Sequence, residues 1–144
     1  MQGPGSRGRR PLAAAGLLLA LATVAGAVGA HVLSAHWSPV RMRVYDIAVR
    51  YQFYDSLGLL GIGLVLRAEG PYAADRRRQE AGGAGYLRAV RAAAWLVFAG
   101  VVLFSGSLYG LTLGAPSWTG FLTPAGGVAL IGGWLLFAYG LWRS

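Results

Sequence analysis

The chain contains four largely apolar stretches, each close to the length of about 20 residues that a helix needs to cross a bilayer. They run from about residue 12 to 33, 45 to 66, 92 to 113 and 120 to 142, and only the second contains charged side chains, those of Asp46, Arg50 and Asp55. Backbone polar groups in lipid must be satisfied within the segment, and the alternation typical of strands is absent. The sequence therefore predicts an all-α fold, an integral membrane bundle of four transmembrane helices.

Composition narrows the possible functions. Charged residues make up only 12% of the chain, against roughly 25% in an average soluble domain. The chain has no cysteine and two histidines, which excludes a cysteine-ligated metal centre and argues against a histidine-rich one. No nucleotide-binding loop, hydrolase elbow or haem-attachment motif is present. We therefore expect no cofactor, no metal site and no enzymatic activity.

The arginines indicate an orientation. Ten of them lie in the basic tail at residues 1–11, in the loop at residues 67–91 and after the last helix, whereas two or three lie on the other side. Basic residues favour the cytoplasmic side, so we expect both termini and this loop there. Because the net charge of +8 mostly flanks apolar segments, nucleic acid is not an expected partner. Cleavage of the first segment as a signal peptide is the alternative to this topology.

The loop contains a run of three arginines, Arg76, Arg77 and Arg78. One interpretation is a patch that binds anionic lipid headgroups. The simpler interpretation is a charge cluster that only fixes the topology of the chain. The sequence leaves both open.

Polar side chains within the apolar segments form the candidate site, and we expect them in the outer half of the bundle. Asp55 lies about ten residues into the second segment, roughly 15 Å along a helix and near the bilayer midplane. Tyr51 and Gln52 precede it by four and three residues, so the three are expected to share a face. The candidate cluster is His31, Tyr51, Gln52, Asp55, Ser105, Tyr109 and Thr123.

Each of these side chains has a functional and a structural interpretation. A carboxyl group is costly in lipid, so Asp55 is either a proton-handling group or a structural hydrogen-bonding partner. The Ser and Thr hydroxyls are expected to bond across helices. His31 is expected at the membrane interface, with pH sensing as the alternative because histidine titrates near neutral pH.

Small residues are expected where helices approach closely in lipid. Gly106, Gly110 and Gly114 are spaced by four, and Gly26 and Ala30 have the same spacing. Packing within one bundle is the main interpretation, and a seam between two copies of the chain is the alternative.

Five short strings together indicate a family. They are Gly26-Ala27-Val28-Gly29-Ala30-His31, Tyr51-Gln52, Phe104-Ser105-Gly106-Ser107-Leu108-Tyr109, Thr123-Pro124-Ala125-Gly126-Gly127 and Gly133-Trp134. In this order the chain resembles, from about Ala13 to Leu141, the small four-helix membrane proteins of the domain of unknown function 423 family, also called the transmembrane protein 256 family. The resemblance implies a bacterial inner-membrane protein that keeps its first helix, and it brings no established reaction. Asp55 stands where these proteins usually carry a histidine.

We therefore expect a small multi-pass inner-membrane protein that acts as a structural or accessory component. Its expected partners are the lipid bilayer and either itself or another membrane protein. The alternative, from a different class, is a small proton-coupled transporter or channel that uses Asp55.

Overall fold

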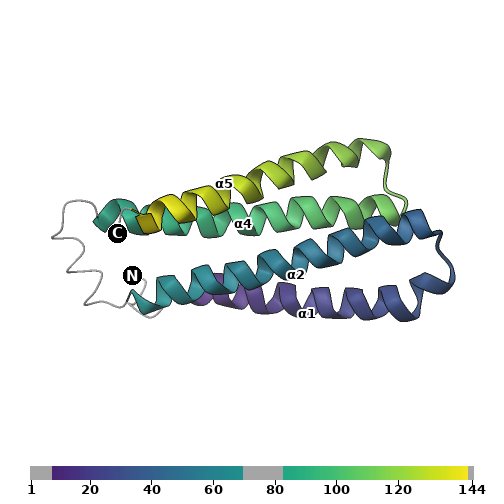
Figure 1. Ribbon diagram of the computed structural model, residues 1–144, viewed down its shortest axis with the longest axis horizontal. Helices are drawn as coiled ribbons and strands as arrows, with labels where there is room; N and C mark the ends of the chain where they lie inside the picture. The colour runs from purple at the N-terminus through teal and green to yellow at the C-terminus, as the bar shows by residue number, and fades with distance from the viewer. Residues whose placement is uncertain (1–7, 70–82, 143–144) are drawn as a thin grey trace.

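The computed structural model describes residues 8–69 and 83–142, and within them the chain is almost entirely helical and contains no strand. The long helices are α1 (Arg9–His31), α2 (Pro39–Ala68), α4 (Gly83–Thr112) and α5 (Leu122–Trp142). Short 3₁₀ turns, η2 (Leu33–Ala35) and η3 (Ser117–Phe121), connect α1 to α2 and α4 to α5. Successive long helices run in opposite directions (Figure 1). The predicted all-α membrane fold is confirmed.

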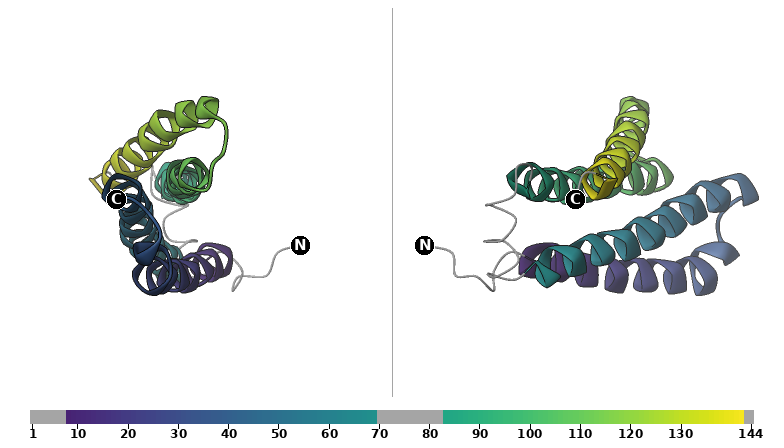
Figure 2. Two further views of the ribbon diagram at one scale, coloured as in Figure 1. Left: turned by 90° about the vertical axis from the view of Figure 1, so that its right-hand side faces the viewer. Right: turned by 60° about the vertical axis from the view of Figure 1, so that its left-hand side comes forward.

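The helices form an open row rather than a closed bundle. α1 packs on α2, α2 on α4 and α4 on α5, whereas α1 and α4 touch only slightly. Viewed along the helices, the row bends into an arc with α1 and α5 at its ends (Figure 2). The second helix is therefore enclosed by neighbours on both sides, while the first and last leave a large part of their surface uncovered.

Three segments have the length and composition of membrane spans: Arg9–Ala35, Gly85–Thr112 and Ser117–Trp142. α2 is more polar, but its 30 residues give it a length of about 45 Å. It lies between two apolar helices and beside them over most of its length (Figure 1). Its neighbours bury Gln52, Asp55 and Ser56, whereas Asp46 and Arg50 are exposed, and α2 is the fourth helix of the membrane bundle.

Two helices begin earlier than the apolar stretches suggest. α2 starts at Pro39, and the hydroxyl oxygen of Ser38 accepts a hydrogen bond of 3.4 Å from the backbone nitrogen of Arg41. A serine N-cap followed by proline is a strong start signal, independent of hydrophobicity. α4 starts at Gly83, inside the segment 67–91 that was expected to be loop. Its first turns bury Val90 and expose Arg88, so the helix continues beyond the apolar stretch. Arg76, Arg77 and Arg78 lie outside the described residues.

Glycines bring α4 and α5 close together. Gly126, Gly133 and Gly140 recur every seven residues on α5 and are buried against α4. A Cβ at Gly133 would lie 2.8 Å from Cγ2 of Val97, and one at Gly126 would overlap the backbone of Phe104. A repeat of seven keeps one face of a helix against its neighbour. The absence of side chains on this face therefore lets the two backbones approach.

The glycine ridge expected on α4 does not pack on another helix within the part of the chain that the structure describes. A Cβ at Gly106 or Gly114 would meet nothing within 4 Å, and one at Gly110 would meet only Ala115 of the following turn. At Gly26 the nearest side chain, that of Val49, is at an ordinary contact distance of 3.6 Å. The expectation of packing at the ridge is therefore wrong within one copy of the chain, because α5 covers a different face of α4.

Candidate functional site

The amide of Gln52 joins three helices. Its Nε2 donates to the carbonyl oxygen of Leu18 on α1 at 2.8 Å, and its Oε1 accepts from the hydroxyl of Tyr109 on α4, also at 2.8 Å. The side chain is only 5% exposed. An amide offers both donors and acceptors, so one buried residue of α2 satisfies groups on the helices to either side. Gln52 and Tyr109 are the two members of the candidate cluster that bond to each other directly.

Tyr45 completes this contact one heptad earlier on α2. Its hydroxyl donates to the carbonyl oxygen of Ala25 at 2.8 Å, and its ring centroid lies 5.2 Å from that of Tyr109. A Cβ at Gly29 would lie 2.8 Å from the Tyr45 ring, so this glycine gives the ring its place. The sequence analysis did not single out Tyr45. The signal was its position seven residues before Gln52, which places both on one face of α2.

Arg41 lies near the start of α2, four residues before Tyr45 and on the same face of the helix. Its Nε donates to the carbonyl oxygen of Thr112 at 2.6 Å, and its guanidinium carbon lies 3.9 Å from the ring centroid of Trp37. The carbonyls in the last turn of a helix have no partner within the helix, and a cation there is favourable. The rings of Trp37 and Tyr45 meet edge to face at 5.7 Å. Arg41 and the rings of Trp37, Tyr45 and Tyr109 therefore form one continuous series of contacts at this end of the bundle.

Asp55 belongs to a separate contact, between α2 and α5. Its Oδ1 accepts a hydrogen bond of 3.0 Å from the indole nitrogen of Trp134, and the side chain is 8% exposed. A Cβ at Gly58 would overlap the indole ring. Gly58 therefore provides the space through which Trp134 crosses from α5 to reach the carboxyl group. In the sequence, Trp134 stands out only as part of the Gly133-Trp134 string.

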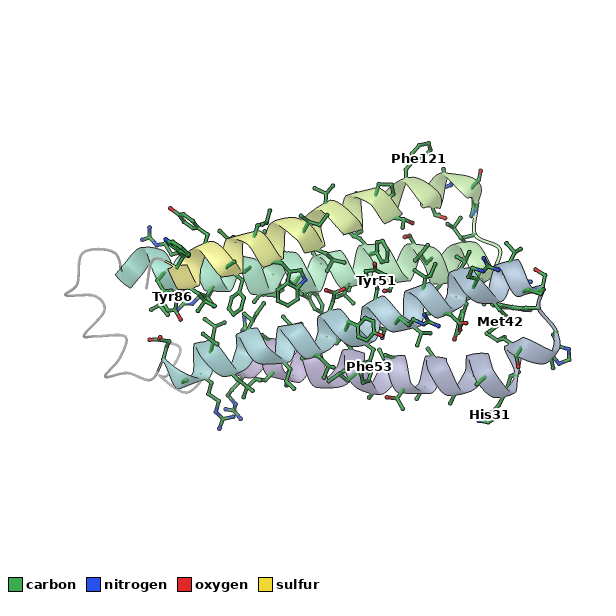
Figure 3. All side chains as sticks on the ribbon, in the orientation of Figure 1. His31, Met42, Tyr51, Phe53, Tyr86 and Phe121 are labelled. Carbon is green, nitrogen blue, oxygen red and sulfur yellow. The ribbon has the colours of Figure 1, made fainter. Side chains whose placement is uncertain are left out.

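The expected shared face of Tyr51, Gln52 and Asp55 divides into three directions. Tyr51 is exposed, and its ring lies 4.9 Å from that of Phe104; Figure 3 labels it on α2. Around the helix axis Tyr51 and Gln52 differ by about 100°, Gln52 and Asp55 by about 60°, and Tyr51 and Asp55 by about 40°, so the expected face is broad rather than a single direction. Because α2 has neighbours on both sides, these directions lead to different helices.

Of the remaining members of the candidate cluster, Thr123 and His31 lie apart from Gln52, whereas Ser105 lines the same cavity as Gln52. The hydroxyls of Ser107 and Thr123 lie 2.7 Å apart and join α4 to α5. The hydroxyls of Ser56 and Ser105 are buried and have no hydrogen-bond partner among residues 8–69 and 83–142. His31 is exposed in the last turn of α1 and points away from the other helices (Figure 3). The structure therefore distributes the cluster over several helix contacts.

A groove of about 570 Å³ lies over the Gln52 contact, between α1, α2 and α4. Tyr45, Gln52, Ser105 and Tyr109 contribute to its wall, and the rest of the lining is apolar. The apolar lining includes Leu21, Val24, Val28, Val102, Gly106 and Leu113. Gly106, left open by the packing of α4, is thus part of this groove. Nowhere in residues 8–69 and 83–142 do three or more His, Asp or Glu side chains gather as metal ligands would.

Comparison with known proteins agrees with the architecture. The model of a family described as protein of unknown function (DUF423) matches residues 25–127. A UPF0382 membrane protein of Staphylococcus haemolyticus is 40% identical over 111 residues, which are 77% of each chain. The UPF0382 membrane protein YwdK of Bacillus subtilis is 39% identical over 81% of this chain and 82% of its own. The UPF0382 inner membrane protein YgdD of Escherichia coli is 32% identical over 82% of this chain and 78% of its own. No solved structure matches the chain.

Proposed function

We propose that this chain, which belongs to the DUF423 family of membrane proteins, is a non-enzymatic accessory component of the bacterial cytoplasmic membrane. The proposal rests on the hydrogen bonds that its polar side chains make between helices. Gln52, Tyr109, Tyr45 and Asp55 each bond to a group on another helix. Buried polar groups that bond across helices stabilise a membrane bundle. They are therefore assigned to holding the helices together.

The shape of the molecule supports an accessory role. α1 and α5 end the row, and only 17% of the residues in the most apolar stretch of each are buried, against 39% in α4. A closed bundle would cover such helices on more sides. The two end helices thus offer long apolar faces to other membrane segments, as expected of a component of a larger membrane assembly.

We also propose the orientation that the arginines indicate, with both termini and the loop after α2 in the cytoplasm. The four spans support it, because an even number returns the chain to its starting side. The positive-inside rule then selects the cytoplasm for the ends of the bundle that carry most arginines. The binding of anionic headgroups of the inner leaflet by Arg76, Arg77 and Arg78 is part of this proposal and depends on the orientation.

Gentle extraction from the native membrane, followed by native mass spectrometry, tests the accessory role. The expected result is a complex with another membrane protein at fixed stoichiometry, which survives Tyr51→Phe, a change on an exposed ring of α2. A chain that always emerges alone or only with copies of itself would contradict the proposal.

A proton-coupled transporter is the second candidate, and one observation favours it. Asp55 places a carboxyl group within the span, 8% exposed and bonded only through Oδ1 among the described contacts. Ionisable side chains at such depth often serve transport. Reconstitution into liposomes with a pH-sensitive dye distinguishes the two functions, because only a transporter dissipates an imposed proton gradient.

A further inference from the structure

Three of the four polar side chains in the groove wall are hydrogen-bonded within the protein. The Tyr45 hydroxyl and the Gln52 amide donate to carbonyls of α1, and the Tyr109 hydroxyl donates to Gln52. The hydroxyl of Ser105 is enclosed, since the residue is only 2% exposed. The surface offered to an occupant is therefore mostly carbon. Its volume of about 570 Å³ falls in the range of small-ligand pockets, about 300–1,000 Å³.

A cation lies at one end of this apolar surface. Arg41 binds the carbonyl of Thr112, the residue before Leu113 of the groove wall. Its guanidinium lies on Trp37, whose ring touches Tyr45 of the groove. The two terminal nitrogens of Arg41 have no acceptor among the described residues, and the side chain is exposed. A fork of N–H donors matches the geometry of a phosphate group.

From this arrangement we propose that the groove is a phospholipid site. One acyl chain lies between α1 and α4 over the Gln52 contact, and the lipid phosphate binds Arg41 at the end near Leu113. The carbon surface excludes a polar ligand. The two terminal nitrogens of Arg41 select an apolar molecule that also carries an anionic group. An amphiphile of this kind is the bilayer's own main component. The site is distinct from the Arg76–Arg78 run and does not depend on the accessory role.

Binding of defined lipids to the delipidated protein tests the proposal. Native mass spectrometry compares dioleoyl phosphatidylglycerol with dioleoylglycerol, which has the same chains and no phosphate. We expect one phosphatidylglycerol per chain, bound about tenfold more tightly than dioleoylglycerol, because hydrogen bonds to charged groups are the stronger ones. Arg41→Gln should abolish this preference, and Arg41→Lys should retain only part of it, because lysine keeps the charge but lacks the planar fork of donors. A preference that survives Arg41→Gln would overturn the assignment of the phosphate.

Glycine substitutions test the position of the acyl chain. A side chain at Gly106 meets nothing within 4 Å and would project into the groove, whereas Gly61 on α2 is equally open but does not line it. We expect Gly106→Leu to weaken both lipids at least tenfold and Gly61→Leu to leave them unchanged. The two changes add the same side chain to exposed helical glycines, so both should preserve or raise helix stability. Val102→Phe provides a second way to fill the groove if Gly106→Leu does not fold.

Two results would overturn the groove assignment. The first is unchanged lipid binding in both Gly106→Leu and Val102→Phe. The second is a dimer that Gly106→Leu converts to a monomer without any change in lipid binding, which would make the groove an interface between copies.

Discussion

Replacing Gln52 by leucine removes the side chain that joins α1, α2 and α4. The substitution keeps the approximate volume and loses two interhelical hydrogen bonds, one to the carbonyl of Leu18 and one from Tyr109. Interhelical hydrogen bonds in membranes are worth about 0.6 kcal/mol on average and up to about 1.7. Two such bonds give an expected loss of about 1–3 kcal/mol in the free energy of unfolding.

A double-mutant cycle separates the two bonds. Tyr109→Phe removes only the bond between Tyr109 and Gln52, so we expect a loss of about 0.5–1.5 kcal/mol. Because both single changes delete that shared bond, the double variant should lose less than their sum, by about 0.6–1.7 kcal/mol. Tyr51→Phe, at an exposed ring whose hydroxyl makes no hydrogen bond to the described residues, serves as the matched control.

Equilibrium unfolding in mixed micelles, followed by far-ultraviolet circular dichroism, measures these changes. Additive losses in the cycle would refute the bond between Gln52 and Tyr109. A loss at Tyr51→Phe as large as that at Gln52→Leu would refute the assignment of Gln52 as the joining residue.

Three further predictions concern packing and topology. Gly58→Ala should destabilise the fold by about 1–3 kcal/mol, because its methyl group would overlap the Trp134 indole, whereas Gly61→Ala should not; thermal unfolding compares the pair. Gly133→Ala should cost a similar amount by pressing a methyl group into α4, and equal stability of Gly133→Ala and Gly132→Ala would contradict the close approach of α4 and α5. A reporter that is active only in the cytoplasm should be active when fused after the last residue, and activity of a periplasmic reporter there would reverse the orientation.

The four helices could be predicted because lipid imposes a minimum length on each apolar segment. The helix starts could not be read from hydrophobicity. α2 begins at Pro39 because of its Ser38 cap, a local signal that an apolar window passes over. α4 begins at Gly83, and its first turns bury Tyr86, Leu87 and Val90 while Arg88 is exposed, a pattern that an average over an apolar window does not detect.

The residues of the candidate site could be predicted from the sequence, but their hydrogen-bond partners could not. Gln52, Asp55 and Tyr109 stand out in the sequence as polar groups in apolar segments. The helix that each side chain faces depends on how the helices are ordered in space. The residue pattern of a single helix does not determine that order. Trp134 shows the difficulty, since an indole serves equally as a lipid-facing ring or as a hydrogen-bond donor. Its bond to Asp55 depends on the bend of the row (Figure 2), which brings α5 within reach of α2 although α2 and α5 each pack on α4.

Glycine spacing likewise indicated that helices approach closely, but not which helices meet. A spacing of four at Gly106 and Gly110 suggested a helix contact, but the seam between α4 and α5 uses a spacing of seven, at Gly126, Gly133 and Gly140. Both periods repeat a helix face. The structure shows that the longer repeat meets a neighbouring helix, while in the shorter repeat only Gly106 lines the groove.

The decisive measurement is proton flux and unfolding free energy on the same proteins, wild type and Asp55→Asn. Asparagine keeps an oxygen that can accept from the Trp134 indole, so an accessory role predicts nearly unchanged stability and no flux in either protein. Asp55→Leu, which offers no acceptor, should lose about 1–2 kcal/mol. Flux in the wild type that Asp55→Asn abolishes at unchanged stability would contradict the structural assignment of Asp55 and establish transport in its place.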